Sequence, residues 1–448
     1  VTGYAVNSNM ENCSFAGDAI GSIDDLNKIY ARMGGLIGYY ETNSGNVYIN
    51  NCHVRGNIKI EEGNYSGKKY DSGINIGGIL GISYFKGTVG DTVYITNSFF
   101  KEGEITAITS SGSAQAGGFC GSFFEDFKED DGPTTNSHHL NNCGVMAGNV
   151  EVEVKNYGKY VNVGGFISSL WLGGTTKNCF SRANVKSRGI GNSNEEAGIT
   201  VDGDNLYGYT HQSGGFSGAL TAGATLESCY ATGNVISEHD GARDLTVGGL
   251  VGTSGGIIRN CYALGDVSAN KIAGASYTNI DGTVGSTSAG GLVGYAYNGA
   301  IQNSFSAGKV ITAQSKEYEA YTGGIVGFTF GTTSNTAVLG EKVTARGPAI
   351  TEAGRIAGNS FSLSNNLSNN YAINTMTTGT GAYGVNITGS VPGTVGLTTI
   401  NGQNASISEF ISASWWQKTL GFDPSAWDFS TPAVYRGYPL LKGLDGQI

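Results

Sequence analysis

Cysteine is the residue type whose number and spacing in this sequence could do chemistry, since the chain contains seven. In a secreted protein such a number ordinarily indicates disulfides. Six of the seven share one local pattern, in which Asn or Ser directly precedes the cysteine: Cys13, Cys52, Cys143, Cys179, Cys229 and Cys261. If these residues stack in register about 4.8 Å apart, the distance between neighbouring Cβ atoms exceeds the roughly 3.5–4.5 Å that a disulfide requires. We therefore expect a ladder of buried free thiols, with Cys120 as a small core residue outside it.

One loop has the spacing of a calcium site. Asp202, Asp204 and Asn205 offer oxygen ligands close together, as calcium-binding loops do. A solvated glycine-rich turn has the same composition, and the lack of a closing Glu favours the turn. The five histidines include no His-Glu-x-x-His pair, which excludes a zinc metallopeptidase. We expect no metal and no cofactor, with these three residues as weak calcium candidates.

Paired carboxylates would be needed for the strongest enzymatic alternative, a polysaccharide lyase or hydrolase. Glu104 and Asp266 fall in the same slot of the sequence repeat described below, but on copies far apart. No Walker phosphate loop is present, and glycine is too frequent for short glycine motifs to indicate a site. We expect a non-catalytic protein, and the lyase or hydrolase stays an alternative because acidic insertion loops could meet in space.

A repeat organises the residues considered so far. Its signature is Gly-Gly followed by two apolar residues, and it recurs at Gly34, Gly77, Gly117, Gly164, Gly214, Gly248, Gly290 and Gly323. A degenerate ninth copy lies near residues 355–358. Because one such unit cannot bury its apolar side alone, it must stack on its neighbours, which places equivalent residues such as Leu250 and Leu292 in one ladder.

Each unit contains three short strand-like pieces and shows no helical period. The last piece carries a β-branched anchor, at Ile58, Ile105, Val150, Val185, Val235, Val267, Val310 and Val343. Three strands per turn predict an all-β fold, a right-handed parallel β-helix of about nine coils. The predicted divisions are an N-terminal partial repeat over 1–33, the β-helix over 34–375, and a terminal coil with its cap over 376–448.

Insertions and the C-terminal segment complete this prediction. The surplus residues follow the closing strand and precede the next Gly-Gly: 59–76, 106–116, 187–213, 237–247, 269–289 and 312–322. Insertions at one corner of successive coils would project from one side of the rod, where a solenoid usually places its partner surface. Residues 406–420 predict one short amphipathic helix, in a cap that covers the open end of the stack.

Composition excludes several classes of protein. The net charge of -10 and the lack of a basic patch argue against nucleic-acid binding. No apolar run is long enough for a transmembrane helix. The 73 glycines and 6 prolines suit a chain that turns often without interrupting strand ladders. Because Val1 begins within a repeat-like stretch, we expect processing or a fragment of a longer protein.

The repeat resembles the GLUG motif, a bacterial repeat that runs Gly-Gly-Leu-Val-Gly and then Ile-x-Asn-Cys-Tyr-Ala-x-Gly-Asn-Val. Residues 248–268 match it almost throughout, and 214–237 and 290–312 are close. The copy at Gly323 places Thr336-Ala337 where Asn-Cys would stand. The resemblance implies a secreted or surface-exposed, often adhesin-like bacterial protein, and such repeats also occur beside IgA-cleaving metallopeptidase modules. It implies no reaction.

The expected function is therefore an adhesin or a rigid stalk at the bacterial cell surface or outside the cell. Its expected partner is a host or community surface protein or glycan, contacted through loop tyrosines: Tyr65, Tyr70, Tyr207, Tyr209, Tyr277, Tyr318 and Tyr321. Two further alternatives stay open, the repeat region of a larger secreted protease and a subunit that self-associates into filaments.

Overall fold

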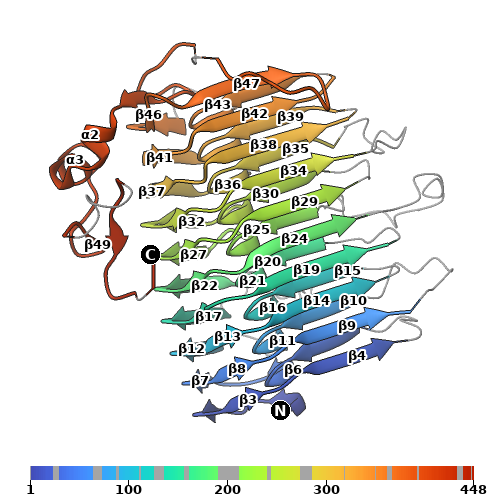
Figure 1. Ribbon diagram of the computed structural model, residues 1–448. Helices are drawn as coiled ribbons and strands as arrows, with labels where there is room; N and C mark the ends of the chain where they lie inside the picture. The colour runs from blue at the N-terminus through green and yellow to red at the C-terminus, as the bar shows by residue number, and fades with distance from the viewer. Residues whose placement is uncertain are drawn as a thin grey trace.

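The structure is a computed structural model. It describes residues 2–23, 30–63, 73–86, 90–109, 113–125, 136–155, 161–189, 211–239, 244–272, 285–316, 318–348, 350–360, 366–390, 393–430, 437–444 and 446–447. The chain forms a parallel β-helix in which strands of successive coils stack into four long sheets, named sheets A to D below (Figure 1).

One coil shows the course of the chain. β30 (Leu245–Gly248) runs into the Gly-Gly bend, followed by β31 (Val251–Ser254), β32 (Ile257–Arg259), β33 (Tyr262–Ala263) and β34 (Val267–Lys271). A coil thus contains five short strands, and the prediction of three was wrong. The strand before Gly-Gly falls within the predicted insertions, whose variable length hides it in the sequence. The strand through Asn-Cys is divided in two by a turn at the asparagine.

Sheets A and D flank the Gly-Gly bend. Sheet A contains β1 (Thr2–Val6), β6 (Ile37–Thr42), β11 (Leu80–Phe85), β16 (Cys120–Glu125), β21 (Ile167–Leu170), β26 (Ser217–Leu220), β31, β36 (Val293–Ala296), β40 (Val326–Thr329) and β44 (Ala357–Ser360). Sheet D contains β5 (Tyr30–Gly34), β10 (Gly73–Gly77), β15 (Ser113–Gly117), β20 (Val161–Gly164), β25 (His211–Gly214), β30, β35 (Thr287–Gly290), β39 (Ala320–Gly323) and β43 (Thr351–Gly354).

Sheet B contributes two strands to most coils. Its strands are β2 (Met10–Glu11), β3 (Ser14–Ala16), β7 (Val47–Asn50), β8 (His53–Arg55), β12 (Thr92–Thr96), β13 (Phe99–Glu102), β17 (Ser137–Asn141), β18 (Gly144–Val145), β22 (Gly173–Lys177), β23 (Phe180–Ser181), β27 (Ala224–Glu227), β28 (Tyr230–Ala231), β32, β33, β37 (Ala300–Ser306), β41 (Thr332–Val338), β45 (Leu367–Ser368), β46 (Tyr371–Ile373) and β48 (Gln403–Ala405).

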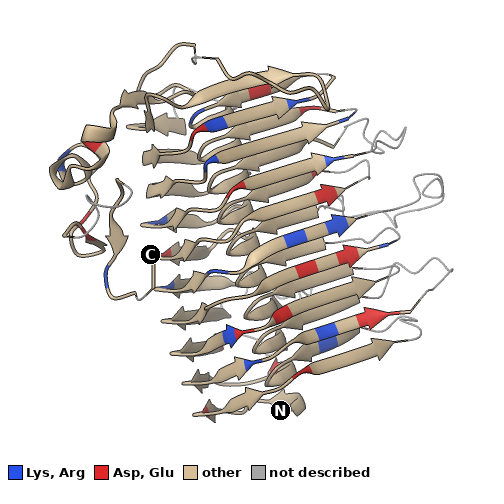
Figure 2. Ribbon diagram, viewed as in Figure 1, with Lys and Arg blue, Asp and Glu red and all other residues tan. Residues whose placement is uncertain are grey.

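Sheet C closes each coil. It contains β4 (Ala19–Ile23), β9 (Ile58–Glu62), β14 (Glu104–Thr109), β19 (Asn149–Val154), β24 (Asn184–Gly189), β29 (Val235–His239), β34, β38 (Val310–Ser315), β42 (Lys342–Arg346) and β47 (Thr377–Gly381). Its alternating residues point inward and outward, so that Val267 and Ala269 are buried between half-exposed neighbours. Basic and acidic residues share the outer face of this sheet rather than separating by sign (Figure 2).

Inward residues form one continuous core along the stack. Leu250 and Leu292 are both fully buried in it, and the amide of Leu250 donates to the Leu292 carbonyl at 2.9 Å. The Gly-Gly pair is required by close approach. A Cβ added to Gly249 would lie 2.2 Å from the Gly291 carbonyl oxygen and 3.1 Å from Ala263 Cβ.

Two details of register differ from prediction. Ile311, not Val310, lies beside Val267, and Val310 is 40% exposed. Because Gly308 lies over Gly265, the residue Lys309 is extra at this corner and shifts the inward position by one. In the next coil, Asn335 and Thr336 occupy the Asn-Cys slot rather than Thr336 and Ala337.

The C-terminal region covers two parts of the rod. The ninth copy is present, with Gly354 beside Gly323 and Arg355 in place of a second glycine. The carbonyl of Ile400 accepts from the amides of Ile356 and Ala357, so this segment covers the end of the stack. The predicted helix is two short helices, α2 (Ile407–Phe410) and α3 (Ala413–Lys418), with N-caps at Ser406 and Ser412.

Contrary to the prediction, these helices do not cover the open end of the stack. With the antiparallel pair β49 (Trp427–Asp428) and β50 (Leu440–Leu441), they lie along the side of the stack (Figure 1). The reason is an outward aromatic ladder on sheet B, formed by Phe180, Tyr230, Tyr262 and Phe305. Trp416, Trp427 and Tyr438 pack against these rings and remove them from water.

Candidate functional site

The candidate site is the corner between the end of sheet C and the start of sheet D, named here the loop-bearing corner. All six predicted insertions lie between these two strands. The central part of five of them lies outside the described residues, at 64–72, 110–112, 190–210, 240–243 and 273–284. The sixth, 312–322, is mostly described and contains the ends of β38 and β39. The rod therefore presents the starting points of these six predicted insertions at one corner of successive coils.

Buried polar side chains line the inside of this corner. The Glu62 carboxylate, 1% exposed, accepts a hydrogen bond from the Thr109 hydroxyl of the next coil. Lys271 is fully buried, donates to the Gly285 carbonyl at 2.8 Å and lies 4.5 Å from the Tyr318 ring centre. Where a chain leaves its strand ladder, backbone groups need other partners. Lys271 supplies one to the Gly285 carbonyl, whereas Glu62 bonds to a side chain.

A serine–histidine pair lies at the same corner. The Ser187 hydroxyl contacts His211 Nε2, which is the arrangement of a nucleophile with its base. Burial, and then the nearby His239, lower the pKa of His211 well below its usual range. Both partners are 1–2% exposed, and His211 Nδ1 has no partner within the described residues. The pair therefore lies in the core, and within the described residues no third group orients the His211 ring as a catalytic imidazole requires.

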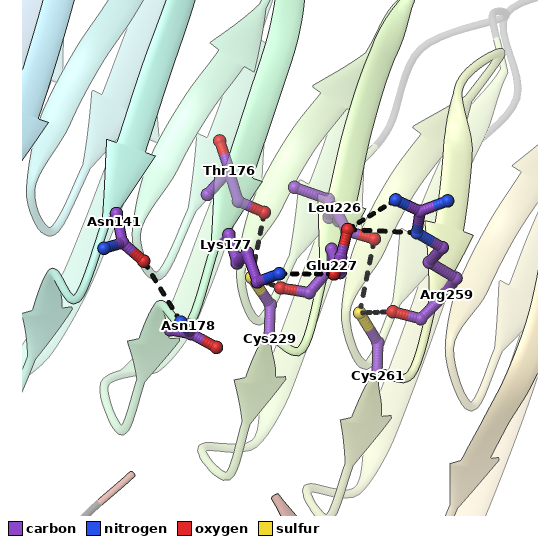
Figure 3. Close-up of polar contacts among 9 residues, drawn as sticks. All are labelled: Asn141, Thr176, Lys177, Asn178, Leu226, Glu227, Cys229, Arg259 and Cys261. Carbon is purple, nitrogen blue, oxygen red and sulfur yellow. Dashed lines mark hydrogen bonds and ion pairs between the residues drawn. The ribbon is translucent and has the colours of Figure 1, made fainter. Parts of the chain in front are cut away.

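The six slot cysteines stack along the inside of sheet B. Cys52, Cys143, Cys179, Cys229 and Cys261 are each fully buried, Cys13 is half-buried, and all seven cysteines are free. The Cys229 and Cys261 thiols donate to carbonyl oxygens of their own and the preceding coil (Figure 3). Burial raises the pKa of Cys52 to about 11. Since the thiolate is the reactive form, the Cys52 thiol is a poor nucleophile.

Carboxylates on sheet B are engaged in ion pairs between coils. Glu227 accepts from Lys177 at 2.7 Å and from Arg259 at 2.5 Å, so one side chain joins three successive coils (Figure 3). Burial opposes ionisation of Glu227, but the hydrogen bonds from Lys177 and Arg259 outweigh it and lower its pKa. A carboxyl group held ionised in this way is unsuited to act as a general acid.

Glu104 and Asp266 accept hydrogen bonds from the next coil at the corner between sheets B and C. The Glu104 carboxylate accepts from Asn149 Nδ2 at 3.1 Å. Asp266 Oδ1 accepts from the Val310 amide at 3.0 Å. The two residues lie on different coils, as expected, and each bonds to the coil that follows its own.

Sequence reasoning missed the conformation of the asparagine before each slot cysteine. Asn51, Asn97, Asn142 and their equivalents have φ between 47° and 55°, a left-handed conformation that Asn tolerates better than most residues. Their side chains also bond to one another, as from Asn142 Nδ2 to Asn97 Oδ1 at 2.8 Å. The repeated Asn in one slot was the signal that could have predicted this turn.

The remaining predicted site residues are placed as follows. Leu250, Leu292, Val235 and Val267 are buried in the core. Asp202, Asp204 and Asn205 lie outside the described residues, as do Tyr65, Tyr70, Tyr207, Tyr209 and Tyr277. Within the described ranges no three His, Cys, Asp or Glu residues come together in a way that could hold a metal. The described helices include none long and apolar enough to span a membrane.

A scan against protein families finds the GLUG motif at residues 244–268 and 285–311. This chain contains GLUG-motif repeats. The matched segments of this GLUG-motif protein run from β30 through β34 and from β35 to the start of β38. A crystal structure described as a "putative immunoglobulin A1 protease" from Bacteroides ovatus is similar at 17% identity with a TM-score of 0.39, covering 92% of this chain and 87% of that chain. Curated protein sequences give no match.

Proposed function

We propose that this GLUG-motif protein is a non-catalytic rod, secreted or held at the bacterial cell surface, which acts as an adhesin or rigid spacer. One observation carries the proposal. An apolar core and hydrogen-bonded sheets run along the described coils, while the six predicted insertions leave from one corner. A continuous stack resists bending between coils, so it holds its insertions in a fixed row at roughly 4.8 Å per coil. Partners would be a surface protein or glycan that contacts this row.

Side-chain chemistry supports a binding role over catalysis. The Ser187–His211 pair and the thiols are buried, and the carboxylates Glu104, Glu227 and Asp266 are engaged in coil-to-coil contacts. A polysaccharide lyase or hydrolase would instead need free carboxyl groups on one exposed face.

The test compares the full chain with a variant in which 190–210 and 273–284 are replaced by short Gly-Ser linkers. Both proteins are applied to a glycan array and to immobilised host-surface proteins. We expect the full chain to bind and the variant to lose binding while keeping its thermal stability. Equal attachment by both proteins would refute a role for the insertions. Release of new reducing ends or unsaturated sugars from polysaccharides would refute the non-catalytic proposal.

A further inference from the structure

The outer sides of sheets A and D meet across the Gly-Gly bend. Thr246 lies between the core residues Leu245 and Val247 and must point outward from sheet D. Its hydroxyl lies 2.8 Å from that of Thr253 on sheet A. Both threonines are less than 9% exposed. Outward side chains of the two sheets therefore contact each other along this corner.

In the last three coils the same corner becomes aromatic. Phe328 lies 5.0 Å from Tyr321, 5.9 Å from Tyr295 and 5.3 Å from Phe330, measured between ring centres. These rings are tilted by 45–69°, so they do not cover one another's faces. Phe330 is 43% exposed, and the adjacent Tyr297 is 41% exposed. Stacked rings elsewhere differ, since Tyr48 and Tyr94 are nearly parallel at 9° and hide their facing sides.

Two carboxylates flank these rings. Glu319 accepts a hydrogen bond from the Tyr321 hydroxyl at 2.6 Å, and Glu352 is the strand partner of Tyr321. Burial, and then the charge of Glu319, raise the pKa of Glu352. The ion pairs found among the described residues include neither glutamate. Two neighbouring negative charges thus lack a cationic partner in the described part of the chain.

A buried hydroxyl at the same place also lacks a partner. Ser288, the other strand neighbour of Tyr321, is 1% exposed, and its Oγ makes no hydrogen bond within the described ranges. Seven residues together are named here the acidic aromatic surface: Ser288, Tyr295, Glu319, Tyr321, Phe328, Phe330 and Glu352.

We propose that the acidic aromatic surface binds organic cations, namely the guanidinium or ammonium groups of an arginine- or lysine-rich partner. Ring faces attract such cations through their quadrupole, and a carboxylate beside the ring pairs with the same charge. A neutral glycan would use the ring faces but would leave both carboxylates uncompensated. The net charge of -10 also favours approach of a basic partner. This inference goes beyond the proposed role of the insertions, because it concerns the body of the rod.

The experiment measures binding of fluorescent hexa-arginine to the full chain by anisotropy, with EDTA present. Phe330→Ala and Glu352→Gln each test one component of the surface. Matched controls are Tyr94→Ala, on the stacked rings of sheet B, and Glu151→Gln, whose carboxylate pairs with Lys186 at 2.7 Å. Thermal unfolding of each variant checks that the fold persists.

We expect both surface variants to weaken binding about fivefold or more, and both controls to leave it unchanged. Equal weakening in all four variants would overturn the proposal, since it would indicate general attraction to an acidic protein. The proposal also fails if the full chain does not bind the peptide. Binding of a neutral oligosaccharide that is lost in Phe330→Ala and kept in Glu352→Gln, without peptide binding, would replace it with a glycan surface.

Discussion

The fully buried side chain of Arg355 donates from Nε to the backbone carbonyl of Asn401 at 2.9 Å. It also donates to the carbonyls of Gly402 and Ile373, both at 3.3 Å. Arg355 stands where the lower coils have the second glycine of the pair, as at Gly324. One side chain thereby connects the ninth coil to the segment that covers the end of the stack.

Arg355→Met should destabilise this end of the rod. The substitution removes the Nε donor from the buried Asn401 carbonyl, while the carbonyls of Gly402 and Ile373 keep backbone donors from Gly396 and Met376. We expect a loss of about 1–3 kcal/mol in free energy of unfolding. Urea unfolding measures the loss, and hydrogen exchange should place it in residues 393–405. Arg188→Met is the control, because Arg188 is exposed and its ion pair with Glu238 is long, at 3.7 Å. Equal losses in both variants would contradict the proposed connection.

The register at the Lys309 corner predicts opposite outcomes for two adjacent residues. Ile311 is fully buried beside Val267, so Ile311→Ala should cost about 2–5 kcal/mol. Val310 points outward, so Val310→Ala should change stability by less than about 0.5 kcal/mol. Chemical denaturation of both variants decides between the two registers. A large loss for Val310→Ala would restore the predicted register, in which Val310 is the inward β-branched anchor.

The asparagine turn predicts a stabilising substitution. Ser228 occupies this turn with φ of 53°, while the equivalent residues of the adjacent coils, Asn178 and Asn260, are asparagines with the same φ. Asn tolerates the left-handed conformation better than Ser and can bond to the neighbouring amides. Ser228→Asn should therefore raise the free energy of unfolding by about 0.5–1 kcal/mol. Thermal unfolding measures the gain, and Ser228→Ala, expected to lower stability, is the comparison.

His138 predicts a specific loss of stability in acid. Its ring is fully buried beside Thr176, and burial, followed by the charge of His139, lowers its pKa to about 3. The unfolded chain binds this proton below about pH 6.5, whereas the folded chain does not until near pH 3. Stability is therefore full above the unfolded pKa and is lost as pH falls toward 3.

The measurement is urea unfolding at pH 7 and pH 4. Between these values the His138 contribution should fall by about 3 kcal/mol in the native sequence. His138→Leu removes the titrating group, so its stability should fall less over the same interval. Parallel losses in both proteins would show that His138 does not contribute to acid sensitivity.

The sequence alone determined the stacking of coils. Gly-Gly pairs, slot cysteines and β-branched anchors recur together, and most inward slots of the coil hold a small or apolar side chain. Repeated units that cannot bury their apolar sides alone must stack. The repeat by itself therefore aligns residues such as Leu250 and Leu292 in one ladder.

Other features depended on tertiary structure. The extra Lys309 makes Ile311, not Val310, the inward residue beside Val267. The spacing of motifs in the sequence does not show where such an added residue shifts the strand register. The acidic aromatic surface joins Tyr295, Tyr321 and Glu352 from three coils. The number of residues between equivalent positions of successive coils varies with the length of the insertions. The hydrogen bond of 3.0 Å from the Tyr262 hydroxyl to Gln447 joins residues 185 apart. No local pattern in the sequence predicts such contacts, because they depend on where the fold of the whole chain places distant residues.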